Sequence, residues 1–260
     1  MASTSSNKAS GKTLYIVRHG QAVHNPRAEA AKEKGCSMDE FFRLMREDDA
    51  LDADLTELGK DQARKCHQDH FVVAGVTGPN PLGIDLVVAS CLSRTMDTAD
   101  LVFPHVPGIP RISIDKFREV NGNLLNGKRR TKSELEERHS NWNFDSLTTQ
   151  EDNSWTPEME KYEDAAERGY QGLVELLTGE TSTTGGDTIL LVCHGGILRY
   201  AMNLHPLVHL ADERTTNDAT TKSVESRFDN CELRKYRLSW KDETSEDGSR
   251  RSILLTQLDH

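Results

Sequence analysis

Two short apolar runs constrain this chain most, because each ends abruptly at a histidine followed by glycine. Leu14 to Val17 leads into Arg18-His19-Gly20, and Ile189 to Val192 leads into Cys193-His194-Gly195-Gly196. Short, apolar, partly β-branched runs predict strands that are covered on both faces of a sheet. Ligands collect beyond the carboxyl ends of such strands, and glycine there lets backbone and ligand approach closely. The two histidines are therefore expected at one rim of a sheet.

Strand and helix signals alternate along the chain, which predicts an α/β fold with a mostly parallel sheet. Two later apolar runs, Glu232 to Ser239 and Ile253 to Leu258, are expected to form antiparallel edge strands joined as a hairpin, split by the charged turn Lys241 to Arg251. The other predicted strands cover residues 14–17, 86–89, 111–114 and 189–192, and the predicted helices cover 39–47, 57–69, 93–102, a short segment from Ser133, about 158–177, and 197–204.

Several further motifs follow Arg18-His19-Gly20 in a fixed order. Asn25 comes first, then Leu55-Thr56-Glu57-Leu58-Gly59-Lys60-Asp61-Gln62-Ala63, Ser90-Cys91-Leu92-Ser93-Arg94-Thr95-Met96-Asp97-Thr98-Ala99, Phe117-Arg118-Glu119, and the closing His194-Gly195-Gly196. In this ordered set, from about residue 14 to about residue 200, the chain resembles the histidine phosphatase superfamily, also called the phosphoglycerate mutase-like fold. The resemblance implies a three-layer αβα sandwich with a doubly wound, mostly parallel sheet.

The resemblance also implies a role for each motif residue. His19 would attack phosphorus and form a phosphohistidine, while Glu119 would act as general acid and then as general base. The phosphate would be held by Arg18, Asn25, Arg94, His194 and Gly195. A phosphomonoester carries about −1.5 to −2 charges at neutral pH, and the planar, permanently charged guanidinium of arginine matches that need. No cofactor and no metal ion are expected, because arginines and histidines neutralise the phosphate.

Each assignment has an alternative when it is taken alone. A histidine at a strand end is more often a hydrogen-bonded structural residue than a catalytic one. Arg94 alone could be a surface arginine of the 93–102 helix, and Asp115 and Glu134 compete with Glu119 as the acid. Cys193 either lines the pocket or is a small buried strand residue, the commoner case for free cysteine. The ordered set of motifs favours the catalytic interpretation of the histidine and the arginine.

Composition narrows the class of protein. A net charge of −10 and a pI near 5.5 argue against a nucleic-acid partner, which basic surfaces recognise. No run of 18 or more apolar residues is present and Met1 to Lys12 is polar, so neither a membrane span nor a secretory signal is expected, and the predicted location is the cytoplasm. Five cysteines without CxxC spacing predict free thiols.

The chain is expected to form one domain over residues 13–260 after a polar leader at 1–12, with insertions at about 26–53, 121–157 and 206–230. The segment from 121 to 157 resembles a mainly fungal branch of the superfamily in its layout, but Leu125-Asn126 stands where that branch often has a Cys-Asp pair. The loop Asn121 to Arg130 ends in three basic residues, and either covers the pocket or is a solvated turn.

The function these observations favour is a metal-independent phosphatase acting on a small phosphorylated metabolite. A phosphoglycerate mutase-type phosphotransferase and a pseudoenzyme that only binds are the alternatives, as is other chemistry in the same pocket. His205 and His209 have the i, i+4 spacing of a helical metal pair, but Pro206 lies between them and ordinary loop histidines are favoured. The oligomeric state, monomer or homodimer, is left open.

Overall fold

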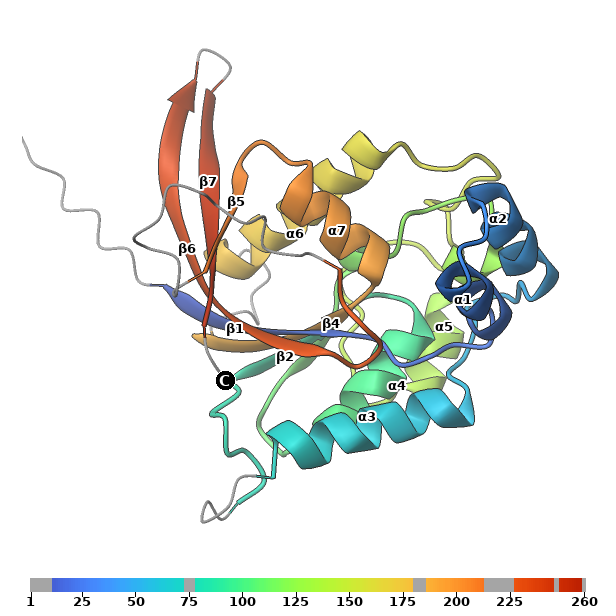
Figure 1. Cartoon of the computed structure of the whole chain (residues 1–260). Helices are drawn as coiled ribbons and strands as arrows, with labels where there is room; N and C mark the ends of the chain where they lie inside the picture. The colour runs from blue at the N-terminus through green and yellow to red at the C-terminus, as the bar shows by residue number, and fades with distance from the viewer. Residues whose placement is uncertain (1–10, 73–77, 180–185, 213–226, 246–247, 259–260) are drawn as a thin grey trace, which may run out of the picture.

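The computed structural model describes residues 11–72, 78–179, 186–212, 227–245 and 248–258 (Figure 1). Within these residues seven strands form one sheet in the order β3-β2-β4-β1-β6-β7-β5. The first four strands in that order are mutually parallel, whereas β6 runs antiparallel to both of its neighbours. The strands are β1 (Lys12–Arg18), β2 (Leu86–Ala89), β3 (Arg111–Ser113), β4 (Thr188–Cys193), β5 (Val208–Asp212), β6 (Leu233–Ser245) and β7 (Gly248–Gln257).

Helices cover both faces of the sheet, which confirms the predicted three-layer αβα arrangement (Figure 1). Side chains alternate along β1: Leu14 and Ile16 pack with α6 and α7, whereas Tyr15 and Val17 pack with α3 and α4. The helices are α1 (Pro26–Glu33), α2 (Met38–Glu47), α3 (Glu57–His70), α4 (Ser93–Val102), α5 (Lys132–Arg138), α6 (Tyr162–Thr178) and α7 (Gly195–Asn203), with short 3₁₀ turns η1 (Asp115–Phe117) and η2 (Leu125–Gly127).

The two central strands form the point at which the winding of the sheet reverses. β1 and β4 are parallel neighbours, with Val17 opposite Val192 and Arg18 opposite Cys193. The chain leaves β1 toward β2 through α3 on one face, and it leaves β4 toward β5 through α7 on the other. Such a reversal opens a crevice between the carboxyl ends of the two strands. His19 and His194 directly follow those ends.

The C-terminal hairpin forms as predicted, but its position at the edge of the sheet was wrong. β5, within a segment assigned only to an insertion, pairs in parallel with β7 and takes the edge. β6 lies inside the sheet beside β1, and Tyr236 and Leu238 are fully buried. The hairpin is also longer than expected: Asp242 pairs with Arg251 inside the ladder. A two-stranded ribbon that runs beyond the covering helices meets solvent, so its polar sequence looks like a turn.

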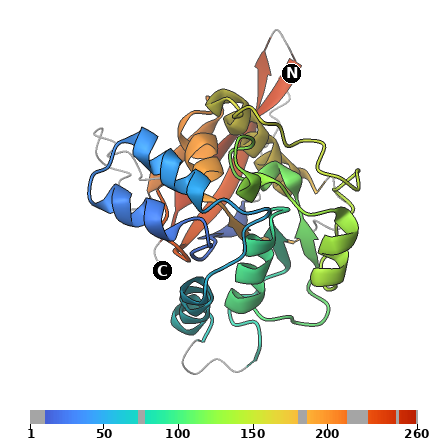
Figure 2. The ribbon, with the colours of Figure 1, turned by 90° about the vertical axis from the view of Figure 1, so that its right-hand side faces the viewer.

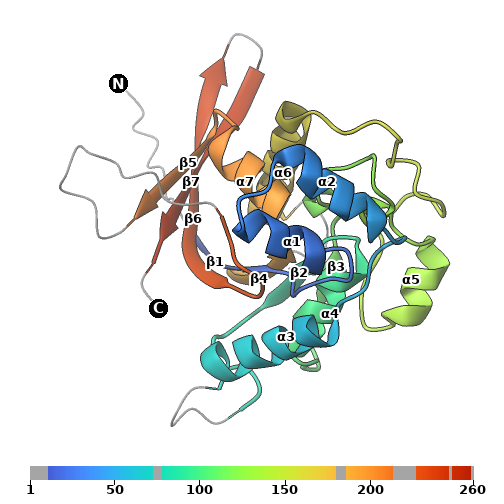
Figure 3. The same ribbon diagram turned by 45° about the vertical axis from the view of Figure 1, so that its right-hand side comes forward.

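Helix α1 was not predicted because its sequence, Pro-Arg-Ala-Glu-Ala-Ala-Lys-Glu, has almost no apolar face. It begins with Pro26 directly after Asn25 at the N-cap, a position in which proline costs no hydrogen bond. Helix α2 is strongly amphipathic, yet none of its residues is fully buried. Both helices lie over the carboxyl ends of the central strands (Figure 3). This position explains why neither helix packs into the core: together they form one wall of the site.

Candidate active site

A pocket of about 300 Å³ opens at the carboxyl edge of the sheet. Figure 2 looks toward this edge, with α1 and α2 in blue on one side and the yellow-green segment around α5 on the other. The pocket is lined by most of the residues that the sequence motifs singled out: Arg18, His19, Asn25, Arg94, Glu119 and Gly195. His194 is fully buried behind them, with its ring 4.9 Å from that of His19 in an edge arrangement.

The ring of His19 is fixed in one tautomer. Its Nδ1 lies 2.7 Å from the carbonyl oxygen of Gly20, and a carbonyl can only accept, so Nδ1 carries the proton. The other nitrogen, Nε2, is then unprotonated, and its lone pair accepts a long hydrogen bond of 3.4 Å from Arg94 Nε. A nucleophile needs this unprotonated nitrogen, and the arginine places a cation beside it. The geometry is that of a histidine prepared for attack on an anionic centre.

Arg94 organises the base of the pocket. Its guanidinium donates in three directions, to His19 Nε2, to His194 Nδ1 at 3.2 Å, and to the backbone oxygen of Asn126 at 2.7 Å. Arginine has no acceptor, so His194 Nδ1 must accept, and the opposite nitrogen then donates to Ser90 Oγ at 2.7 Å. Both histidines are thereby held neutral and oriented around one guanidinium.

The electrostatics of the pocket support that protonation state. Burial, and after it the charges of Arg94 and Arg18, lowers the pKa of His19 well below the usual value for histidine. Burial and Arg94 lower the pKa of His194 in the same way. Both effects disfavour an additional positive charge, so both rings remain neutral at pH 7. A phosphate dianion is the kind of ligand that this field attracts.

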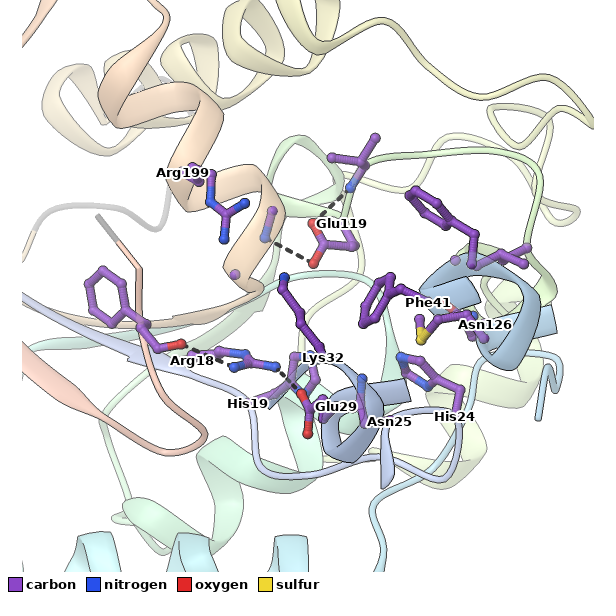
Figure 4. Close-up of a pocket in the computed structure, with 18 of the residues that line it drawn as sticks. Arg18, His19, His24, Asn25, Glu29, Lys32, Phe41, Glu119, Asn126 and Arg199 are labelled. Carbon is purple, nitrogen blue, oxygen red and sulfur yellow. Dashed lines mark hydrogen bonds and ion pairs between the residues drawn. The ribbon is translucent and has the colours of Figure 1, made fainter. Parts of the chain in front are cut away.

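Arg18 extends from the end of β1 toward the pocket (Figure 4). Its Nη1 donates to Phe228 O at 3.0 Å, and its Nη2 pairs with Glu29 at 2.7 Å. Its Nε is buried and has no hydrogen-bond partner, and a Cβ at Gly195 would come within 3.3 Å of it. A buried donor without a partner is costly, so this N–H is available to a ligand oxygen. The glycine keeps the approach to it open.

Asn25 and His24 lie at the start of α1, on the side of the pocket opposite α7. Asn25 is buried, and its Oδ1 accepts from the backbone N–H of Ala22 at 3.0 Å, which leaves its amide NH₂ as the group that can donate. His24 also lines the pocket, and its Nδ1 is buried without a partner. The motif analysis missed His24, although it lies between His19 and Asn25 in the same segment. Its unpaired ring nitrogen is the signal that the structure adds.

Glu119 lies at the first turn of α7, where its carboxylate caps the helix. Oε1 accepts from the backbone N–H groups of Val120 and Ile197, each at 2.9 Å, and Oε2 accepts from Gly196 at 3.1 Å (Figure 4). A carboxylate oxygen has two lone pairs, so Oε2 keeps one free for a proton. The competing acids lie elsewhere: Asp115 pairs with Arg118 at 2.7 Å, and Glu134 forms the capping box of α5.

Gly196 leaves the space that Glu119 occupies. A Cβ at this position would lie 2.3 Å from Oε1 of Glu119. Gly196→Ala should therefore displace the carboxylate and lower kcat/KM for an alkyl phosphate by about 10²-fold, the usual cost of misplacing a reacting group by about 1 Å. If the effect acts through Glu119, the double variant Gly196→Ala/Glu119→Gln should lose little more than Glu119→Gln alone. Additive losses would contradict this explanation.

The loop that carries His19 rests directly on helix α3. A Cβ added at Gly20 would lie 2.4 Å from the carbonyl oxygen of Gly59, and one added at Gly59 would lie 2.1 Å from that of Gln21. Backbone therefore packs on backbone here. The Gly20 N–H also donates to Thr98 Oγ1 of α4 at 3.1 Å. The Leu55–Ala63 motif thus packs against the loop that carries His19, through Gly59.

Arg94 is positioned by a buried aspartate that the motif analysis missed. Asp52 is fully buried and accepts from Ser93 N at 2.8 Å and from Ser93 Oγ at 2.5 Å, at the start of α4. Arg130 neutralises it over 3.0 Å. A buried carboxylate needs such a partner. Asp52 and Arg130 therefore hold the helix that carries Arg94.

The basic end of loop 121–130 corrects both sequence interpretations. Arg129 is buried and donates to backbone oxygens of residues 149–151, Arg130 holds Asp52, and Lys128 lies 4.9 Å from the centre of the Trp155 ring. None of the three lines the pocket. These three side chains are neither ligand contacts nor a solvated turn, because each one contacts a distant segment of the chain. The part of the loop before Lys128 does line the pocket, through Gly122, Leu124, Asn126 and Gly127.

One wall of the pocket is apolar. Four apolar side chains of helix α2 line the pocket, which explains why this face is not buried in the core: Met38, Phe41, Phe42 and Met45. Figure 4 shows Phe41 among them. Leu124 and Met159 face the same space. Sequence periodicity predicted the helix but not the purpose of its apolar face. A pocket with a charged base and an apolar wall suits an organic phosphate better than inorganic phosphate.

Three other residues that the sequence singled out lie outside the pocket. Cys193 is fully buried in the core on the α6 and α7 side. His205 bonds Glu167 at 2.9 Å and stacks on Tyr170, while His209 lies on β5, so the pair is not on one helix. Across the described residues no group of three or more His, Cys, Asp or Glu side chains could hold a metal ion, and no helix is long and apolar enough to cross a membrane.

Comparison with known proteins identifies the family. The model of the histidine phosphatase superfamily, branch 1, matches residues 14–240, which include every motif residue discussed above. The chain belongs to this superfamily. Phosphoglycerate mutase-like protein 1 of Arabidopsis thaliana is 26% identical over 251 residues, covering 86% of this chain and 79% of that protein. Phosphomutase-like protein 3 of Candida albicans is 27% identical over 199 residues, covering 74% and 60%.

Solved structures of similar proteins include the alpha-ribazole phosphatase from Shigella flexneri. It is 16% identical, has a TM-score of 0.47, and the match covers 91% of this chain and 93% of that one. The superfamily assignment therefore rests on the family match and not on this likeness. Membership of this superfamily and the anion-attracting pocket together favour chemistry on a phosphate ester.

Proposed function

We propose that this member of the superfamily hydrolyses a small organic phosphomonoester, a phosphorylated metabolite, through a phosphohistidine on His19. The observation that carries the proposal is the lone pair of His19 Nε2, held unprotonated by the Gly20 carbonyl and placed beside Arg94. A neutral histidine among arginines is equipped to attack phosphorus. The partner of this protein would then be its substrate, with no cofactor required.

The first step transfers the phosphoryl group to the enzyme. His19 Nε2 forms a bond to phosphorus while the ester P–O bond breaks, and a proton on Glu119 passes to the departing oxygen. Arg18 and Arg94 bind the oxygens of the transferring group, and the amide of Asn25 donates to it. The proton stays on Nδ1, hydrogen-bonded to the Gly20 carbonyl oxygen, which keeps the ring aligned during attack. The alcohol then leaves the pocket.

The second step restores the enzyme. Glu119, now ionised, takes a proton from a water molecule, whose oxygen bonds to phosphorus as the P–N bond breaks. The products are inorganic phosphate and neutral His19, and Glu119 is again protonated. The carboxylate serves both steps because its backbone donors hold it in one position.

The direct test is hydrolysis of p-nitrophenyl phosphate, followed by a panel of phosphorylated metabolites, each with and without EDTA. We expect release of inorganic phosphate that EDTA does not reduce. The relatives with mutase-like names supply the alternative, so 3-phosphoglycerate should be included with a bisphosphoglycerate primer. Isomerisation without phosphate release would support the phosphotransferase and overturn the hydrolase. No reaction with any ester would favour the pseudoenzyme.

The role of Glu119 is tested by its leaving-group dependence. Glu119→Gln should lower kcat/KM for an alkyl phosphate by about 10² to 10⁴-fold, because a basic alkoxide needs a proton as it departs. The loss for p-nitrophenyl phosphate should be much smaller, since its leaving group is stable as an anion. The measurement is kcat/KM on both substrates for wild type and variant. Equal losses would show that Glu119 only positions α7 and that another group supplies the proton.

A further inference from the structure

Three cationic side chains that have no role in the proposed reaction also line the pocket. They are Lys32 on α1, Arg199 on α7, and Arg227 just before β6. Figure 4 shows Lys32 and Arg199 directed toward the same part of the pocket from opposite sides. Among the residues that the structure describes, none of the three forms an ion pair. The carboxylate that acts to raise the pKa of Lys32, that of Glu29, is already bound to Arg18 at 2.7 Å.

The charges around Lys32 are mostly of its own sign. Burial, and then Arg199, Arg227 and Arg18, lowers the pKa of Lys32, and Glu29 opposes them only in part. Glu33 and Asp229 also line the pocket, but neither lies within ion-pair distance of these cations in the described part of the chain. Like charges that converge without a counter-ion destabilise the fold. An anionic ligand would remove that repulsion.

The scissile phosphate does not account for this group of cations. That phosphate belongs at the base of the pocket, where Arg94 contacts His19 and His194. Arg199 lies four residues beyond Gly195 on α7, which places its backbone about 6 Å farther along the helix than Gly195. Lys32 Nζ lies 5.0 Å from the centre of the Phe41 ring of α2. The cations therefore surround a second position.

We propose that the leaving group of the substrate carries a second anionic group, a phosphate or a carboxylate, which Lys32, Arg199 and Arg227 bind. The inference rests on the proposed function, because it describes the other end of the same substrate. Guanidinium and ammonium groups make strong, charge-assisted hydrogen bonds to both kinds of oxyanion. The apolar face of α2 would then lie along the carbon skeleton that joins the two anions.

The experiment compares monoesters of equal length that differ only at the far end. The substrates are alkyl phosphates of three to five carbons that end in a methyl group, a carboxylate or a second phosphate. Wild type should show kcat/KM at least 10-fold higher for one of the two anionic series than for the methyl series. Lys32→Met and Arg199→Met should each reduce that ratio by about 10- to 100-fold, the worth of a hydrogen bond to a charged group. The preferred series identifies the second anion.

Lys34→Met is the matched control, because Lys34 ends α1 but does not line the pocket. Its selectivity ratio should equal that of wild type. Equal kcat/KM for all three series, or a ratio that Lys32→Met and Arg199→Met leave unchanged, would overturn the second-anion site while the phosphatase activity stands. If no ester is hydrolysed, the proposed function fails. Calorimetry with 1,4-butanediol bisphosphate and butyl phosphate still tests the second site, since equal affinities would overturn it.

Discussion

Replacing His19 by alanine should abolish turnover, with kcat reduced by roughly 10⁴-fold or more, as expected when a covalent nucleophile is removed. The two other histidines at the site, His194 and His24, are not placed to replace it. His194 is buried behind Arg94, with its Nδ1 accepting from that guanidinium. His24 lines the pocket but belongs to the loop before α1 and has no partner that directs its ring. The measurement is steady-state release of phosphate from p-nitrophenyl phosphate.

The intermediate provides the second readout for this variant. Wild-type protein mixed with ³²P-labelled substrate and quenched in base should carry label that acid releases, the behaviour of phosphohistidine, whereas His19→Ala should carry none. His67→Ala is the matched control: this histidine of α3 bonds the carbonyl oxygen of Val102 and lies outside the pocket. It should retain both activity and label. Labelling of His19→Ala would identify a different nucleophile.

Arg94→Lys should reduce kcat/KM by about 10³ to 10⁵-fold, comparable to the loss of an arginine that stabilises phosphoryl transfer. Lysine keeps the charge, but it cannot donate at once toward His19, His194 and the Asn126 carbonyl as the planar guanidinium does. Arg64→Lys is the matched control, because Arg64 is exposed on α3 and pairs only with Asp61. A small loss, within about 10-fold, would show that charge alone suffices and that the multiple N–H donors of the guanidinium have no role.

The pH profile of Arg94→Ala separates the effect of the arginine charge on His19 from the loss of its hydrogen bonds. Arg94 contributes to lowering the pKa of His19, so Arg94→Ala should raise that pKa. A raised pKa keeps His19 protonated, and therefore unable to attack, up to a higher pH. The acid limb of the residual activity should consequently move to higher pH than in wild type. An unchanged acid limb would mean that a different group controls it.

Sequence reasoning predicted the elements that carry a periodic or abrupt pattern. The strands that precede His19 and His194 are apolar and short, and helix α4 was predicted with the bounds that it has, 93–102. Because parallel strands deliver their carboxyl ends to one edge, the pattern was enough to bring Arg18, His19 and His194 together. The acid could not be chosen in this way. Only the tertiary structure shows that Glu119 caps α7 and that Asp115 and Glu134 have other partners.

The parts that sequence reasoning missed depend on contacts between distant segments. Asp52 is an ordinary loop aspartate in the sequence, and its role appears only when Ser93 lies 2.8 Å away. For Arg130 the sequence allowed a ligand contact or a solvated turn, because a charge run carries no information about its partner, which is that same aspartate. β5 and α1 were missed for the opposite reason: they are weakly patterned locally and are stabilised by what they pack against. Lys32 and Arg199 are far apart in the sequence, and only the structure shows that they line the same pocket.

The contact between Gly20 and Gly59 places backbone against backbone, with no side chain between the nucleophile loop and helix α3. A side chain can change rotamer and absorb a small shift, whereas two peptide units in contact cannot. Any displacement of the start of α3 is therefore passed to the loop that holds His19. The outer side of α3 is exposed, with charged pairs such as Lys65 and Asp69. A substitution that shifts the first turn of α3, around Gly59, would therefore impair catalysis without touching the pocket, whereas changes farther along the helix would not.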